Sequence, residues 1–269
     1  MHRIALLILG LCLVAPLARA EQWSKTFNLT GKPNLRVTTS DANIRVDTWD
    51  QNIIEAQVTA EGWKVSENAP GEHGVRVVQH QTGDAVDLEV RLPHTVCIVC
   101  IHPADHRVDV EIHMPREGRV NLRSSDGSIR LANLKGDMDL QSSDGALDVE
   151  GVDGALKAHA SDGHIKIAGR FDWLQLSSSD GRIEARALAG STISSGWSLH
   201  SGDGSVTVQL PAAFAADVEL HTGDGHISLD MPVSVEGQLG HHDIRGKLNG
   251  GGNLLTIHTG DGSIRLEKS

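Results

Sequence analysis

Seven aspartates in Ser-Asp-Gly or Gly-Asp-Gly triplets recur along the chain, and a row of carboxylates could bind Ca²⁺ or supply the acid and base for glycoside cleavage. Calcium-binding β-rolls use a denser glycine and aspartate repeat that gives each ion several oxygen ligands, whereas this chain has one such aspartate per repeat. Even repetition also favours a structural role over a catalytic one. We therefore interpret these pairs as structural turns: Asp126 and Gly127, Asp144 and Gly145, Asp162 and Gly163, Asp180 and Gly181, Asp203 and Gly204, Asp224 and Gly225, Asp261 and Gly262.

Four histidines share one offset, three residues before an aspartate of this set: His159, His200, His221 and His258. Imidazoles brought together could share a metal ion, or repel one another when protonated near pH ~6. If successive copies stack, His200 and His221 become immediate neighbours. The alternative is an exposed position that tolerates polar residues, in a chain with 15 histidines. No metal site is predicted.

Two cysteines, Cys97 and Cys100, stand three residues apart in an unusual segment over residues 93–106. In an oxidising compartment this spacing favours a local disulfide. Two free buried cysteines, or a metal site completed by His102 and His106, are the alternatives. A c-type haem site is excluded, because that motif needs histidine directly after the second cysteine.

The elements that position these residues follow from the repeat. The aspartates step by 18, 18, 18, 23, 21 and 37 residues, and the last step divides in two if Asp243 is a worn copy. Apolar residues at every second position before and after each Asp-Gly predict two strands joined by a turn. We expect the turn to need glycine for its positive φ. A small residue two before each aspartate, such as Ser142, is expected to point inward and bond the turn backbone.

Two arrangements of such strands are possible, an antiparallel series of hairpins and a parallel solenoid. Arg130, Asp148, Lys166 and Glu184 occupy one outward offset in successive copies and alternate in charge. Parallel stacking places each of them between opposite charges, which is stabilising. The prediction is an all-β, parallel β-solenoid (β-helix) of about 18–23 residues per coil, with an irregular N-terminal β cap.

The chain divides into three parts. Residues 1–20 are predicted to be a secretory signal peptide, because a short apolar run precedes the small-x-small sequence that ends at Ala20. Residues 21–110 are expected to form a capping region of strands that contains the cysteine segment, with a loop over Gly62–Gly74. Residues 111–269 are the solenoid repeats. No later stretch reaches transmembrane length, so we expect export to the periplasm or the cell surface.

Composition narrows the function further. The net charge of −11 disfavours nucleic acid and anionic lipid as partners. Aromatic residues make up 3% of the chain and tyrosine is missing, so the core must be aliphatic. The sequence contains no Gly-x-Ser-x-Gly elbow, phosphate-binding loop or zinc-protease motif. We therefore predict a protein that is not an enzyme and uses no cofactor.

The repeated Ser/Gly-Asp-Gly-x-Ile/Val turn behind a signal peptide resembles the bacterial putative-adhesin family of β-strand-repeat proteins of unknown function. The resemblance runs from about residue 24 to the end, and the segment 97–106 departs from the family pattern. It implies a parallel solenoid of the cell envelope. The function that fits is a binding scaffold that presents a flat β face to a glycan or an envelope protein. The alternatives are a polysaccharide-acting enzyme and a metal- or pH-responsive sensor that uses stacked histidines.

Overall fold

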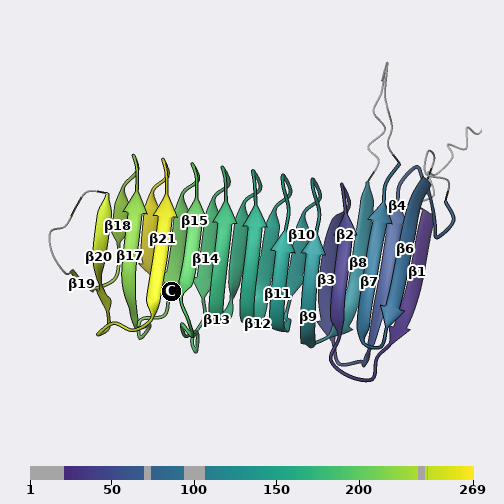
Figure 1. The fold of residues 1–269 in the computed structure, drawn as a ribbon, viewed down its shortest axis with the longest axis horizontal. Helices are drawn as coiled ribbons and strands as arrows, with labels where there is room; N and C mark the ends of the chain where they lie inside the picture. Colours follow the sequence, from purple (N-terminus) through teal and green to yellow (C-terminus); the bar gives the residue numbers. More distant parts are fainter. Residues whose placement is uncertain (1–20, 70–73, 94–106, 236–239, 241) are drawn as a thin grey trace, which may run out of the picture.

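The computed structural model describes residues 21–69, 74–93, 107–235, 240 and 242–269. In this part of the chain every regular element is a strand, and the strands form one continuous ladder that wraps into two long faces. Figure 1 shows the strands side by side along an elongated body, joined by tight turns at its upper and lower edges. No helix of the described residues is long and apolar enough to cross a membrane.

The first face contains twelve strands, with a further short strand, β5 (Lys64–Ser66), paired to its first member. In spatial order these are β6 (Gly74–Thr82), β7 (Ala85–Arg91), β2 (Asn34–Thr39), β9 (Glu117–Arg123), β11 (Lys135–Gln141), the second half of β12 (Leu147–Ala160), the second half of β13 (Ile165–Ser178), β15 (Trp197–Ser201), β21 (Leu254–Thr259), β17 (Ala216–Thr222), β20 (Asp243–Leu248) and β19 (Val233–Val235).

The second face contains eleven strands, among them the strand that follows each Asp-Gly turn. In spatial order these are β1 (Glu21–Asn28), β4 (Ile53–Ala60), β8 (Val108–Pro115), β3 (Asn43–Trp49), β10 (Ile129–Ala132), the first halves of β12 and β13, β14 (Ile183–Ala187), β16 (Val206–Leu210), β22 (Ile264–Lys268) and β18 (Ile227–Leu229).

The solenoid-like parallel arrangement agrees with the prediction from alternating charge. Asp148 on β12 lies opposite Arg130 of β10 and Lys166 of β13, and Lys166 lies opposite Glu184 of β14. Antiparallel pairing is confined to strands near the two ends of the ladder. Matching positions of successive repeats therefore lie side by side, so each outward column of side chains can be read from the sequence.

The interior is an aliphatic stack filled from both faces. The residue three after each aspartate is buried in most copies, as with Ile129, Leu147 and Ile183, and so is the residue four before it, as with Leu140 and Leu176. Burial of such side chains is the main favourable contribution to the folding free energy. The residues between them point to solvent, because side chains in a strand alternate between its two faces.

The Asp-Gly turns need glycine for a reason other than the predicted one. The expectation of a positive φ is wrong, because none of these seven glycines has one. Each glycine instead lies against a backbone carbonyl one coil away, that of Ala42 for Gly127 and that of a glycine for the other six: a Cβ on Gly163 would lie 2.1 Å from the carbonyl oxygen of Gly145. The turns stack so closely that no side chain fits between them.

The small inward residue at each corner completes the turn. The Gly145 N–H donates to Ser142 Oγ (3.1 Å), and that hydroxyl donates to the Gly127 carbonyl of the neighbouring coil (3.3 Å). The buried hydroxyl therefore accepts the N–H of the turn, as expected for the small inward residue. At the one corner with alanine, Ala160, the Gly163 N–H reaches the Ser143 carbonyl at 3.3 Å instead.

A coil near each end of the chain inserts between other coils. The first coil, β2 and β3, lies between β7 and β9 on one face and between β8 and β10 on the other. The last coil, β21 and β22, lies between the coils of β15–β16 and β17–β18 (Figure 1). The reading of Asp243 as a worn copy of the turn is wrong, since β20 begins there and runs antiparallel to β17.

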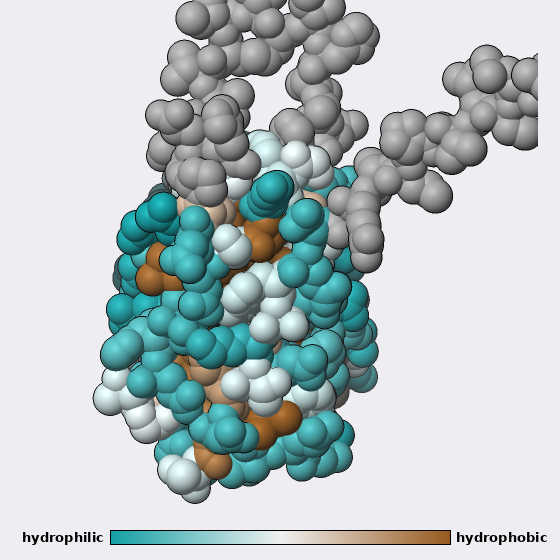
Figure 2. All heavy atoms as spheres, turned by 90° about the vertical axis from the view of Figure 1, so that its right-hand side faces the viewer, coloured by the Kyte–Doolittle hydropathy of each residue, from teal (hydrophilic) through white to brown (hydrophobic). Residues whose placement is uncertain are grey.

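The N-terminal end of the stack is built from β1, β5 and β6. The predicted loop over Gly62–Gly74 contains β5, which contacts β1 and β4. Trp23 and Trp63 are half-buried and pack against the core here. Figure 2, which looks onto this end, shows mostly hydrophilic side chains with hydrophobic patches between them. The predicted boundary at residue 110 falls within β8, and β3 pairs with both β8 and β10, so the segments before and after it belong to one ladder. A capping role for residues 21–110 stays a prediction.

Candidate functional site

The aspartates of the turns form one exposed column along an edge of the molecule. The N–H of each aspartate donates to a carbonyl of the adjacent turn, as from Asp144 to Ser125 at 2.9 Å, which keeps the turns in register. Asp41 continues the column below Asp126, since the Asp126 N–H donates to Ser40 at 2.9 Å. In spatial order the column is Asp41, Asp126, Asp144, Asp162, Asp180, Asp203, Asp261 and Asp224. Within the described part of the chain, none of these carboxylates forms an ion pair.

Repulsion in this column is strongest where the carboxyls approach. A hydrogen bond with Asp41, then burial, then the charges of Asp41 and Asp144 raise the pKa of Asp126. The ionised form is therefore disfavoured in the folded chain. It lowers the unfolding free energy above the raised pKa, and this loss of stability disappears as the pH falls below the pKa of the unfolded chain.

We expect Asp126→Asn to increase the unfolding free energy at neutral pH by a few tenths of a kcal/mol, as for other exposed charge interactions. The gain should shrink as acid protonates the wild-type carboxyl. Thermal melting near pH ~7 and near pH ~4 checks this. Asp162→Asn, in the middle of the column, is the comparison variant and should change stability only slightly. A loss of stability at neutral pH in the Asp126 variant would contradict the repulsion.

The histidine column is assembled, with one correction. His200 and His221 are not immediate neighbours, because the inserted strand β21 places His258 between them. Ring centroids are 5.0 Å apart for His200 and His258 and 4.8 Å for His258 and His221, with 26° between the planes in both pairs. His221 Nδ1 lies 2.6 Å from Asp243 Oδ1. In the described ranges no three His, Cys, Asp or Glu side chains converge as a metal ion requires.

The fourth histidine of the predicted set stands apart from this stack. His159 lies across β13 from His200, and its Nδ1 is 2.8 Å from Ser177 Oγ. Cys97, Cys100, His102 and His106 lie outside the described residues, so the disulfide stays a prediction.

The histidine stack predicts a pH dependence. Burial, then the charges of His200 and His221, lower the pKa of His258. The folded chain then binds fewer protons here than the unfolded chain, so stability falls as the pH drops below the unfolded value of about 6.5. We expect His258→Gln to reduce this acid-side loss by about 0.5 kcal/mol or less, because the imidazole is only partly buried and solvent screens its charge.

Urea unfolding of the wild type and the His258→Gln variant, near pH ~7.5 and pH ~5.5, measures that difference. His164→Gln, at an exposed turn, is the matched control. The groups that face His258 are His200 and His221, and Asp243 faces it only across His221. Equal acid-side losses in the wild type and the His258 variant would contradict the prediction.

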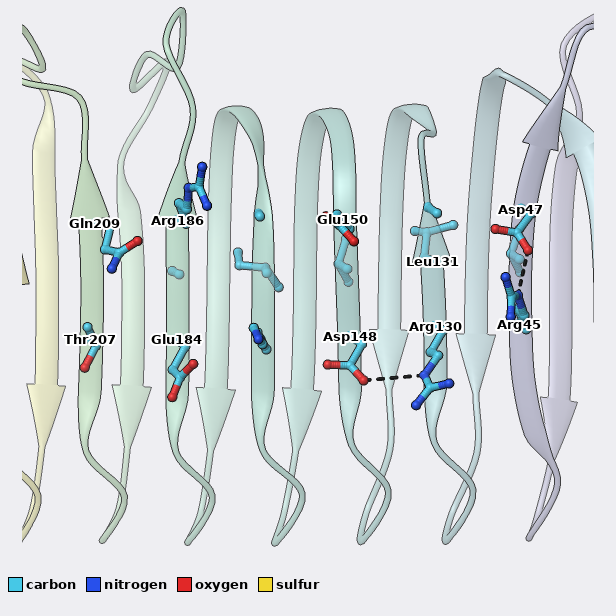
Figure 3. A pocket seen from close by; sticks show the side chains of 17 residues that line it. Arg45, Asp47, Arg130, Leu131, Asp148, Glu150, Glu184, Arg186, Thr207 and Gln209 are labelled. Atoms are coloured by element: carbon cyan, nitrogen blue, oxygen red, sulfur yellow. Dashed lines mark hydrogen bonds and ion pairs between the residues drawn. The ribbon is translucent and has the colours of Figure 1, made fainter. Parts of the chain in front are cut away.

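An open trough of about 730 Å³ lies on the outer side of the second face. It crosses β3, β10, β12, β13, β14 and β16, and two columns of outward side chains form it (Figure 3). The first column is Arg45, Arg130, Asp148, Lys166, Glu184 and Thr207. The second column is Asp47, Ala132, Glu150, Ala168, Arg186 and Gln209.

Charge in the trough is balanced, with four cations and four carboxylates in the two columns. Arg130 Nε lies 3.6 Å from Asp148 Oδ2 across the strands, and Arg45 Nε lies 2.7 Å from Asp47 Oδ2 along its own strand (Figure 3). The hydrogen bond with Asp47 raises the pKa of Arg45, so this guanidinium remains charged. No aromatic ring lines the trough. Recognition here must use charge and hydrogen bonds.

Three charged side chains of the trough have no ion-pair partner in the described part of the chain: Glu150, Lys166 and Arg186. Lys166 and Arg186 lie on neighbouring strands on two sides of Ala168, because Ala168 follows Lys166 by two residues and lies opposite Arg186. The small side chains of Ala132 and Ala168 leave the floor low on either side of Glu150. An acidic group of a ligand could lie there.

Sequence reasoning found the first column and missed the second. The signal was present, because strand periodicity places the residue two further along on the same face. Ala132, Glu150, Ala168 and Arg186 follow the first column at that offset. Two of these residues are alanine and the other two have opposite charges, so the column shows no repeated chemistry in the sequence.

Comparison with known proteins agrees with this architecture. No protein with a curated description matches the chain. A putative adhesin from Bacteroides fragilis is 12% identical over 91% of this chain and 97% of its own, with a TM-score of 0.50. A putative adhesin from Parabacteroides merdae is 13% identical over 91% and 96%, with a TM-score of 0.42. A putative cell adhesion protein from Clostridium sporogenes is 12% identical over 93% and 100%, with a TM-score of 0.38.

The first of these structures shares the fold with this chain; at such low identity the likeness extends no further. The family model Toastrack DUF4097 matches residues 104–267, which is more than half of the chain. This match bears out the resemblance seen in the repeated Asp-Gly turns. The chain belongs to the Toastrack DUF4097 family.

Proposed function

We propose that this protein is a non-catalytic, exported binding scaffold of the cell envelope, which holds a linear polymer in the trough of its second face. The observation that carries the proposal is the continuity of the trough over six neighbouring strands, with a polar or charged residue on every one. A site for a small substrate needs a few groups that converge on one point, whereas a solenoid presents an extended surface. The candidate polymers are a glycan and an extended segment of an envelope protein.

Other observations fit this role. Residues 1–20 have the pattern of a secretory signal peptide, which leads to the periplasm or the cell surface. The Bacteroides fragilis structure of the same fold bears the name putative adhesin, and we extend a binding role to this chain. The carboxylates of the turn column recur once per coil along an edge and do not converge on one point, as a catalytic site would require, which supports a protein without catalysis.

An array of immobilised glycans and extended peptides tests the proposal. We expect the purified protein to bind a subset of polymers, and Ala168→Trp to abolish binding by filling the floor of the trough. Ala168 points outward and is half-buried, so the larger side chain should leave the core undisturbed. Ser198→Trp, at an exposed position on the first face, is the matched control. Failure to bind any polymer, or full binding by the Ala168 variant, would overturn the proposal.

A further inference from the structure

We infer that the trough takes a linear β-linked glycan with one carboxylate per disaccharide, laid across the strands along the axis of the solenoid. This inference rests on the proposed function and names its ligand. It follows from the spacing of like charges, from the cations that lack a partner and from the two low points in the floor.

The spacing of like charges is set by the sheet. Neighbouring strands lie about 4.8 Å apart, so residues of one column recur at that distance. In the first column the cations Arg130 and Lys166 stand two strands apart, and so do the carboxylates of Asp148 and Glu184. Groups of one sign therefore repeat every ~9.6 Å along the trough.

That repeat matches the length of one disaccharide in an extended β-linked glycan. Successive sugars in such a chain are turned over, so the same substituent faces the protein once per disaccharide. A peptide in the β conformation presents side chains on one side every ~6.8 Å and would lose register within one repeat. A polyproline II peptide repeats every ~9.3 Å, which makes it the competing polymer to be tested.

The unit that repeats at this distance is a cation beside an alanine. Arg130 is followed two residues later by Ala132, and Lys166 by Ala168. A carboxylate above each alanine can accept hydrogen bonds from the neighbouring cation. Such charge-assisted hydrogen bonds are stronger than those between neutral groups.

The two cations differ in what they already contact. Lys166 has no ion-pair partner in the described ranges, and Arg186 lies opposite Ala168 on the next strand. Arg130 is only loosely paired with Asp148, at 3.6 Å, and both side chains are exposed. Exposed pairs of this kind contribute little, so a ligand can replace them.

The carboxylates of the trough determine which anions are accepted. Asp148, Glu150 and Glu184 lie between the cation positions and can accept hydrogen bonds from sugar hydroxyls. They repel a polymer that carries a negative charge on every unit, as does the net charge of −11. The trough therefore favours a sparse, regularly spaced polyanion.

Titration calorimetry with four probes of equal length tests the inference. The probes are an oligosaccharide of alternating glucuronate and N-acetylglucosamine, a chitin oligosaccharide, an oligoglucuronate and a peptide of Glu-Pro-Pro repeats. We expect the alternating oligosaccharide to bind tightest and to weaken as salt is added. Lys166→Gln and Arg130→Gln should each weaken it about three- to tenfold, the loss of one ordinary hydrogen bond at an exposed site. Lys157→Gln, on the first face, should leave it unchanged.

Three results would overturn the inference. The chitin oligosaccharide could bind as tightly as the alternating one, the Lys166 variant could bind like the wild type, or the Glu-Pro-Pro peptide could bind best. If Ala168→Trp still abolishes binding in any of these cases, the trough remains the binding site and only the ligand assignment fails. If Ala168→Trp has no effect, the proposed function fails with it.

Discussion

Gly163→Val is expected to prevent stable folding, and Gly163→Ala to lower the unfolding free energy by at least about 3 kcal/mol, the upper end of the range for overpacking. A Cβ on Gly163 would lie 2.1 Å from the Gly145 carbonyl oxygen and 3.1 Å from that of Asp144. Both obstacles are backbone atoms of a turn that hydrogen bonds at Ser143 tie to its two neighbours, so no side chain can move aside. The coil must separate from its neighbour.

Urea unfolding of the purified variants gives these free energies. The matched control is Gly252→Ala, where φ is not positive and the nearest atom to the new Cβ is 3.4 Å away. That change should alter stability by less than about 1 kcal/mol. Gly163→Ala with wild-type stability would mean that the turns are not in contact. Because φ of Gly163 is not positive, the alanine variant tests the contact between neighbouring coils and not the backbone conformation of a single turn.

The parallel stack could be predicted because its evidence lies in single columns. Arg130, Asp148, Lys166 and Glu184 alternate in sign at one offset, and only parallel neighbours 18 residues apart bring them together. The alternation of buried and exposed residues then follows from strand geometry. Local pattern and global packing agree in these coils, which is the condition under which a sequence specifies its fold.

The order of the terminal coils could not be predicted from the same pattern. The coil with Asp261 carries the same turn as the others, and its residues pair equally well with any neighbour of that pattern. Its insertion beside Ser201 and Thr222 depends on the long excursion through β19 and β20. Repeat proteins have this ambiguity, since each unit recognises only its neighbours. This insertion is the reason that His258 lies between His200 and His221 in the structure, where the sequence had predicted direct neighbours.

The structural reason for glycine in the turns also could not be predicted from the sequence of a single repeat. A glycine before an apolar run is usually explained by its own φ. Here the constraint comes from the adjacent coil, and it becomes visible only when the register between Gly145 and Gly163 is known. The glycines with positive φ that mark opposite corners, Gly136 and Gly154, have both reasons at once.

The core also contains a cluster of three aromatic side chains, which the aliphatic pattern of the repeats does not predict. Trp197 stands on β15 where its paired neighbours have Leu174 and Leu255, and it is 1% exposed. Its ring centroid lies 5.0 Å from that of Phe214 and 6.2 Å from that of Phe171, with the latter ring nearly perpendicular. Two of the three phenylalanines of the chain thus surround one tryptophan. This aromatic group fills the core where the repeat length increases to 23 residues.

We expect Trp197→Ala to lower the unfolding free energy by about 3–5 kcal/mol, through lost burial and the cavity that remains. Trp197→Leu should cost much less, because leucine fits the same column on both neighbouring strands. The indole N–H of Trp197 has no hydrogen-bond partner among the described residues, so its removal carries no penalty. Trp49→Ala, at a half-exposed ring stacked on His113, is the control and should cost about 1 kcal/mol.

Hydrogen exchange should show where the damage falls. Coils of a repeat protein interact with their neighbours only, so a cavity weakens the coils around it first. In a simple stack the loss would spread to the nearer end. Here β21 is held between β15 and β17. The four neighbouring strands β15, β21, β17 and β20 should therefore lose protection together, while β9, β11 and β12 keep theirs. Uniform loss along the whole chain, or loss confined to β15, would contradict this coupling of the inserted coil to its neighbours.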